Sequence, residues 1–361
     1  MLLTGLLLGI ALGFTMQRGR FCVTGAFRDL FIARKTRWLT AFLIVIAVQS
    51  VGVFALDALG VISLAPKDFP WLATIIGAFI FGFAIVLAGG CATGTIFRAG
   101  EGLVGSWFAL IFYALFASIT KTGALAPYSD ALRSVTTEAS TIHGVLGISP
   151  WFLVIALVTG VGLLARHHLI EGAKLPRLAS LPARKTGLAH LFFEKPWGAF
   201  SSALVIAAIA IAAWPLSWAT GRKSGLGITT PFSNLTSYLV GGDTGVIDWG
   251  VYLVIGILVG ATIAAKGSGE FRVRMPDAVT TVRAIIGGSL MGIGATLAGG
   301  CTIGNAMVNS ATFGLVGWVS LIFMILGTGA ATRTFIIGSA RGKAVPATVP
   351  ATASDFASAN H

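Results

Sequence analysis

Two stretches of this 361-residue chain repeat each other: GFAIVLAGGC at Gly82–Cys91 and GIGATLAGGC at Gly292–Cys301. They align without a gap, and both end in LAGGC. The similarity continues downstream, where GLVGSW from Gly102 and GLVGW from Gly314 are each followed shortly by LIF. Self-similarity of this extent indicates an internal duplication, so we expect the chain to contain two related halves.

The composition around this repeat is that of a membrane protein. Hydrophobic residues make up 55% of the chain and charged residues 11%, with a mean hydropathy of +0.88 and 47 glycines. These values exclude a disordered chain, a nucleic-acid-binding domain and a disulfide-stapled secreted scaffold. Continuous apolar runs favour helices over a β-barrel. We expect one all-α polytopic domain over residues 1–361. The apolar runs cover 2–15, 38–60, 71–89, 103–121, 150–166, 197–219, 249–265, 281–298 and 313–337.

These nine spans divide into two halves of four, which we place at residues 1–121 and 197–340. One helix, 150–166, separates the halves, and an odd linker inverts the second half relative to the first. A weaker resemblance between Arg18–Phe27 and Gly221–Phe232 places another broken segment in each half. Inverted repeats with broken helices are a recurrent transporter plan. The sequence therefore predicts short re-entrant helices that meet from both faces and form an hourglass-like pore.

The basic residues report the expected orientation. With nine spans the termini lie on opposite sides, and one side collects 20 of the 25 Lys and Arg residues. The positive-inside rule assigns that side to the cytoplasm. We expect the N-terminus outside, the C-terminus in the cytoplasm, and a disordered cytoplasmic tail over residues 341–361.

The double-glycine segments are candidates for the pore constriction, because residues 89–97 and 299–312 carry no charge. A helix that restarts after each cysteine would point free N–H groups at the pore and favour an anion. Neutral donors could be added by Thr93, Thr95, Thr302 and Asn305. The alternative is that the glycines only allow close helix packing. The expected substrate-binding residues are Cys22, Cys91, Cys301, Gly90, Gly300, Thr93, Thr302 and Arg222.

The cysteines carry the expected chemistry. All three lie in predicted broken segments. A neutral S–H is a weak donor with a polarizable sulfur, which suits a sulfur-bearing anion. The absence of a C-x-x-C pair, and of a neighbouring His or acid, disfavours a disulfide or metal role, so we expect no metal and no cofactor. The alternative is that each cysteine is a small buried hydrophobe. Arg222 is included because it lies on the side of the membrane that is expected to carry few Lys and Arg residues. There it could form an outer funnel for anions.

Several motifs resemble the YeeE/YedE family of sulfur-compound transporters over nearly the whole chain. They are MQRGRFCVTGAFRD from Met16, LAGGCATGT from Leu87, TGR and GLGIT within Thr220–Thr229, and AGGCTIGN from Ala298. The resemblance implies an hourglass of nine membrane helices plus short re-entrant ones. It also implies thiosulfate uptake through a line of cysteines, with a small TusA-like sulfurtransferase (YeeD) as cytoplasmic partner.

The expected function is thiosulfate import across the bacterial cytoplasmic (inner) membrane, without enzymatic activity and without nucleic acid as a partner. No phosphate-binding loop motif is present, and no acidic residue lies mid-span, so neither ATP hydrolysis nor a carboxylate proton relay is expected. Two alternatives stay open. One is a transporter or channel for another sulfur or selenium oxyanion, and the other is a membrane thiol oxidoreductase.

Overall fold

The computed structural model describes residues 2–65, 68–174, 186–195, 197–242 and 244–337. Within these ranges the chain is helical, and its extended pairs are three isolated bridges rather than named strands. The described residues contain nine helical segments long and apolar enough to cross a membrane. The expected all-α polytopic class is therefore confirmed, whereas the expected tail at 341–361 lies outside the described residues.

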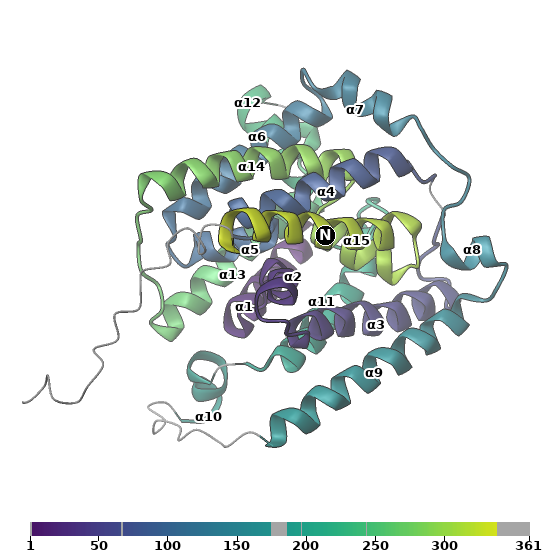
Figure 1. Ribbon diagram of the computed structural model, residues 1–361, viewed down its shortest axis with the longest axis horizontal. Helices are drawn as coiled ribbons and strands as arrows, with labels where there is room; N and C mark the ends of the chain where they lie inside the picture. Colours follow the sequence, from purple (N-terminus) through teal and green to yellow (C-terminus); the bar gives the residue numbers. More distant parts are fainter. Residues whose placement is uncertain (1, 66–67, 175–185, 196, 243, 338–361) are drawn as a thin grey trace, which may run out of the picture.

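The α-helices are numbered along the chain, as labelled in Figure 1. The π- and 3₁₀-helices (η) lie between or after them in the chain and are given at the end of the next sentence. The helices are α1 (Leu2–Gly19), α2 (Val23–Ile32), α3 (Arg37–Ala58), α4 (Trp71–Leu87), α5 (Ala92–Gly100), α6 (Val104–Lys121), α7 (Ala126–Arg133), α8 (Ile142–Leu146), α9 (Pro150–Lys174), α10 (Gly187–Ala189), α11 (Ala199–Trp218), α12 (Thr229–Gly241), α13 (Trp249–Ser268), α14 (Ala278–Ala298), α15 (Leu315–Thr332), η1 (His190–Glu194), η2 (Thr244–Val246), η3 (Thr302–Asn309) and η4 (Arg333–Ile337).

Three of the spans consist of a long helix, a short break and a short helix. The pairs are α1 with α2, α4 with α5, and α14 with η3, and each break contains one of the cysteines. The predicted restart of a helix immediately after the cysteine of each double-glycine segment is confirmed, at Ala92 and Thr302, and α2 likewise starts at Val23, directly after Cys22. The separating helix is longer than the predicted 150–166, because α9 continues through its basic C-terminal turns to Lys174.

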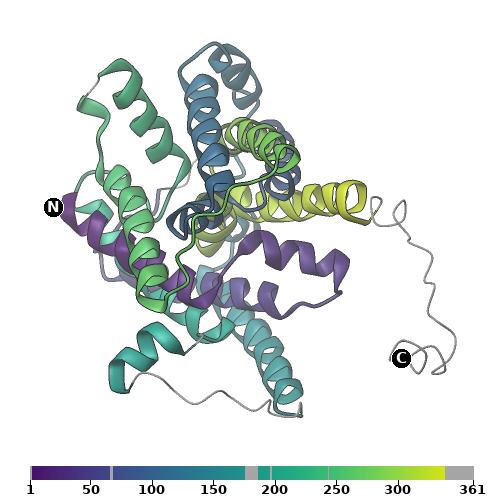
Figure 2. The same ribbon diagram turned by 90° about the vertical axis from the view of Figure 1, so that its left-hand side faces the viewer.

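Helices of the two halves pack against each other in matching pairs. Helix α1 packs along α13, as α3 packs along α11; both views show α1 in purple beside the green α13 (Figures 1 and 2). Likewise α6 packs along α14, as α15 packs along α4, and α4 contacts α14 directly. Exchanging each helix of one half for its counterpart in the other maps this set of contacts onto itself.

The contact between α1 and α13 depends on glycine. Gly9 and Gly13 of α1 face Gly256 and Gly260 of α13 so closely that a Cβ on any of the four would lie within 2.3 Å of a backbone oxygen of the other helix. Small residues four apart let helix backbones approach in this way when no hydrophobic effect drives them together. Part of the glycine excess is thus explained by helix packing.

Helix α9 lies at the edge of the bundle, where it packs mainly along α3 (Figure 1). Most of its apolar side chains are exposed, including Phe152, Ile155 and Leu163. An apolar surface of this kind on a spanning helix is the surface that hydrocarbon covers. A polar site is therefore expected away from α9, among the short helices.

Candidate functional site: three cysteines at the starts of short helices

Each cysteine caps the N-terminus of a short helix. Cys22 precedes α2, Cys91 precedes α5 and Cys301 precedes η3. Cys91 and Cys301 are fully buried, whereas Cys22 is partly exposed, and all three thiols are free. The unpaired N–H groups at a helix start carry partial positive charge. Three soft sulfur atoms therefore lie where the backbone favours negative charge.

The sulfur atoms of Cys22 and Cys91 face the same small space. A Cβ atom added to Gly94 in α5 would lie 3.4 Å from Sγ of Cys91 and 3.6 Å from Sγ of Cys22. The Gly94 amide also donates to Sγ of Cys91 at 3.4 Å. The structure thus brings two of the three predicted thiols, Cys22 and Cys91, together at the start of α5, and Cys301 lies at the start of η3.

The double glycines form the turns that lead into two of these cysteines. Gly89 and Gly299 adopt left-handed conformations, with φ of 74° and 80°, at the ends of α4 and α14. A Cβ on Gly90 would lie 3.1 Å from Oγ1 of Thr95, and one on Gly300 would lie 2.5 Å from Oδ1 of Asn305. The predicted residues Gly90 and Gly300 therefore make room for the short helix that folds back against each turn.

An arginine binds the end of the helix that precedes each turn. The guanidinium of Arg98 donates to the Gly89 carbonyl, and its Nη2 lies 3.8 Å from Sγ of Cys22. Nη1 of Arg133, from α7, donates to the carbonyls of Leu297 at 3.1 Å and Thr296 at 3.3 Å. A cation at a helix C-terminus offsets the partial negative charge of the free carbonyls. Sequence reasoning missed the role of Arg133, because α7 lies far from Cys301 in the chain.

A buried hydroxyl without a partner follows each cysteine within one or two residues of the chain. Among the described residues, Oγ1 of Thr24, Thr93 and Thr302 is buried and has no hydrogen-bond partner. By contrast, Thr95 donates to the Cys91 carbonyl, and Asn305 donates to the Ala298 carbonyl and to Ser320. A buried polar group without a partner is costly, so these three hydroxyls are available to a ligand.

Thr24 is a site residue that the sequence analysis missed. The available signal was the spacing Cys-x-Thr, which Cys22–Thr24 shares with Cys91–Thr93. Thr95 and Asn305 were also predicted as donors, but each already donates a hydrogen bond to a nearby backbone carbonyl. The structure therefore separates Thr95, whose hydroxyl bonds within its own short helix, from Thr24, which lines the cavity at Cys22.

Arg222 lies apart from this cluster. Its Nε is 3.6 Å from Oδ2 of Asp248, and its guanidinium lies over the Trp249 ring. Burial lowers the pKa of Arg222, while the neighbouring Asp248 raises it. Its Nη1 is buried without a partner among the described residues. No contact of the described residues joins Arg222 directly to a cysteine, so its predicted place in the outer funnel stays a prediction.

A polar cavity lies at Cys22. It has a volume of about 210 Å³, and besides Cys22 and Thr24 it is lined by three arginines and one carboxylate; they are Arg20, Arg28, Arg98 and Asp29. Its polar lining and positive charge suit a small anion. In the described residues, no group of three or more His, Cys, Asp or Glu side chains is arranged to hold a metal ion.

A sequence profile of the sulphur transport family matches residues 18–330, which include all three cysteines and both double-glycine turns. The chain belongs to the sulphur transport family. Its relatives in this family include the thiosulfate transporter TsuA of Escherichia coli K12, which is 50% identical over 92% of this chain and 94% of the relative.

A second family relative is the thiosulfate transporter TsuA of Spirochaeta thermophila, which is 34% identical over 91% of this chain and 97% of the relative. The probable transporter YedE of Escherichia coli K12 is 42% identical over a shorter region, 28% of this chain and 25% of the relative. The two longer matches span essentially the whole fold, and the relatives in all three are named as transporters.

Proposed function

We propose that this member of the sulphur transport family imports thiosulfate, and that its three cysteine thiols pass the anion along the pore. The observation that carries the proposal is the position of Cys22, Cys91 and Cys301, each at the start of a short helix with free thiols. The names of the two full-length relatives support thiosulfate as the substrate.

The chemistry of the site fits a sulfur-bearing dianion. Helix N-termini offer backbone N–H groups to its oxygens, and the unpartnered hydroxyls of Thr24, Thr93 and Thr302 add neutral donors. A protonated thiol donates weakly to the terminal sulfur of thiosulfate, whereas a thiolate would repel the anion. We propose that the anion enters past Cys301, reaches Cys91 at the narrowest point and leaves past Cys22.

The same proposal includes two inverted repeats around an hourglass-shaped pore. Support comes from the matching helix pairs, α1 with α13 and α3 with α11. Further support comes from matched left-handed residues in the two halves. Arg20 and Lys223 both have a φ of 50°, and Gly89 and Gly299 have φ of 74° and 80°.

We further propose an orientation with the N-terminus outside and the C-terminus in the cytoplasm of a bacterial inner membrane. The excess of Lys and Arg on one side supports it, 20 of the 25 residues. The cavity at Cys22 then faces the cytoplasm. Resemblance to the family suggests that a TusA-like sulfurtransferase receives the thiosulfate there.

The energetics require a sink or a driving ion. Moving one negative charge inward costs about 2.3 kcal/mol per 100 mV of membrane potential, so a dianion meets roughly twice that cost. Prompt consumption of thiosulfate in the cytoplasm or a co-transported cation has to offset it. The transport rate in vesicles is therefore expected to rise when the potential is removed, unless a cation is co-transported.

The test is uptake of labelled thiosulfate into proteoliposomes, with labelled sulfate as the comparison anion. The parent protein should take up thiosulfate in preference to sulfate. Cys91→Ala and Cys301→Ala should each lower the thiosulfate rate at least about tenfold, since each removes a donor from a buried site. Cys91→Ser retains a donor but loses the soft sulfur, so it separates the need for a donor from the need for sulfur.

Near-parental uptake by both alanine variants would overturn the relay while leaving the transporter in place. Competition by other sulfur or selenium oxyanions identifies the alternative cargo. The oxidoreductase alternative predicts that oxidants convert thiols to disulfides. Titration that still finds three free thiols under oxidising conditions argues against it.

A further inference from the structure

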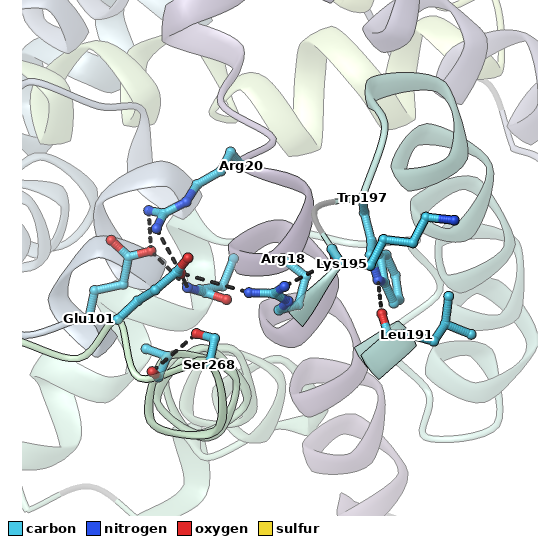
Figure 3. Close-up of polar contacts among 10 residues, drawn as sticks. Arg18, Arg20, Glu101, Leu191, Lys195, Trp197 and Ser268 are labelled. Carbon is cyan, nitrogen blue, oxygen red and sulfur yellow. Dashed lines mark hydrogen bonds and ion pairs between the residues drawn. The ribbon is translucent and has the colours of Figure 1, made fainter. Parts of the chain in front are cut away.

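Arg20 is the centre of a charged network beside the cysteine site. Its Nη1 lies 2.6 Å from Oε1 of Glu101, and its Nη2 lies 2.8 Å from Oε2 of Glu270. Nε2 of Gln17 donates to the same two oxygens, at 3.2 Å and 2.7 Å. Figure 3 shows Arg20 directed at Glu101, with Arg18 on the other side of the network. One guanidinium thus bridges two carboxylates from distant parts of the chain.

Arg20 also separates two cavities of similar volume, each about 210 Å³. The first contains the carboxylates, with Arg272 and Arg274, and the second contains Cys22. Arg20 lines both of them. Its side chain is 51% exposed, so an anion from solvent can reach its guanidinium, whereas the side chain of its partner Glu101 is 8% exposed.

The chain geometry connects this network to the thiols. Arg20 lies two residues before Cys22, in a left-handed conformation with φ of 50°. Glu101 is the C-terminal cap of α5, the helix that begins after Cys91. The pair Arg20–Glu101 therefore joins the loop of one cysteine to the far end of the helix that another cysteine starts.

We propose that Arg20 is a shared cation that controls release of the anion. It pairs with Glu101 and Glu270 when the Cys22 cavity is empty, and with a divalent sulfur anion when that cavity is occupied. The two carboxylates compete with the anion for the same guanidinium, and in this way keep the anion from binding too tightly to leave. This inference rests on the proposed function, since it assigns an exit site to the same pore.

The competition predicts opposite changes in anion affinity for substitutions of the carboxylates and of Arg20. Neutralising a carboxylate frees Arg20 for the anion, so Glu101→Gln or Glu270→Gln should tighten anion binding in the Cys22 cavity and slow its release. Arg20→Gln removes the cation, so it should weaken binding. A network that only braces the fold gives no such opposition, because all three substitutions would then act in the same direction.

The experiment measures occupancy of the exit cavity through Cys22, since Cys22 is partly exposed and the other two thiols are buried. Purified full-length protein is alkylated with N-ethylmaleimide at increasing thiosulfate concentrations. Free glutathione in the same tube corrects for any loss of reagent. The thiosulfate concentration that halves the alkylation rate of Cys22 gives an apparent Kd, and uptake into proteoliposomes is measured in parallel.

We expect Glu270→Gln and Glu101→Gln to lower the apparent Kd about fivefold and to lower the maximal uptake rate, while Arg20→Gln raises the apparent Kd about fivefold. The control is Lys35→Gln, a basic residue in the loop after α2 that lines neither cavity and should leave the apparent Kd within twofold. Glu270 is 40% exposed on its side chain, so its substitution tests the idea even where Glu101→Gln does not fold.

Two outcomes overturn the inference. One is an unchanged apparent Kd in both glutamate variants, and the other is a shift in the same direction in the glutamate and arginine variants. Failure of the proposed function is distinguishable, because the parent protein would then show neither thiosulfate uptake nor protection of Cys22.

Discussion

At the scale of single residues, Gly94 has a role that its sequence context does not show. It lies in helix α5 with ordinary helical φ, so no backbone conformation requires glycine there. What a side chain would occupy instead is the space between Sγ of Cys91 and Sγ of Cys22. The missing Cβ leaves open the gap that the proposed relay needs.

Gly94→Ala should therefore separate transport from stability. The added methyl group meets both sulfurs at ordinary van der Waals distance, and alanine is the better helix former by about 1 kcal/mol. Thiosulfate uptake into proteoliposomes should fall at least tenfold, while the apparent Tm in detergent stays the same or rises. Gly160→Ala, in the outward-facing α9 where a Cβ meets nothing within 4 Å, is the matched control. Parental uptake by Gly94→Ala would show that the anion does not pass between these sulfurs.

The cysteines, both double glycines, Thr93 and Thr302 were predictable from sequence, because they lie within short repeated motifs. Thr24, Gly94 and Arg133 were not. Their importance depends on which atoms of other helices approach them, and spacing along the chain carries no information on such approach. The two carboxylate partners of Arg20 were not predictable either, because Glu101 and Glu270 come from distant parts of the chain.

At the scale of elements, the short helices are explained by their boundaries. The left-handed turns at Gly89 and Gly299 end α4 and α14, and a new helix starts as soon as the next cysteine is passed. The sequence could predict these restarts because double glycine interrupts an otherwise continuous apolar run. It could not predict the π-helical geometry of η3, where the α5 counterpart is an ordinary α-helix.

The tight α1–α13 pair is expected to be sensitive to a single methyl group. Gly9→Ala places a Cβ 2.2 Å from the Leu253 carbonyl oxygen, so the helices must separate or shift. Overpacking of this kind costs about 1–3 kcal/mol. The apparent Tm of the detergent-purified protein should drop by several degrees, whereas Gly162→Ala in α9, where a Cβ has open space, should leave it unchanged. An equal Tm for the two variants would mean that α1 is free to move away from α13.

At the scale of the whole molecule, the matching helix pairs and the distribution of Lys and Arg are independent observations on the proposed architecture. The pairs are a property of the folded chain, whereas the Lys and Arg bias is a property of the sequence. The number of spans was predictable because each is a long apolar run. Which spans touch was not, because an apolar run does not identify the helix against which it packs.

The proposed orientation predicts opposite labelling of two loops. In a variant whose three cysteines are replaced by serine, Lys223→Cys should react with a membrane-impermeant maleimide on intact cells, and Lys35→Cys should react only after the cells are opened. Both positions lie in loops between helices of the described chain. The reverse pattern would invert the membrane orientation and, with it, the assignment of Cys22 to the cytoplasmic end.

The arginines that close the two double-glycine turns come from different parts of the chain. The first turn is closed by Arg98 from the short helix that follows it, but the second is closed by Arg133 from α7, which lies between the two predicted halves. The second predicted half, residues 197–340, therefore depends on a cation from outside its own sequence. Expressed without α7, it would leave the carbonyls at the end of α14 without their arginine.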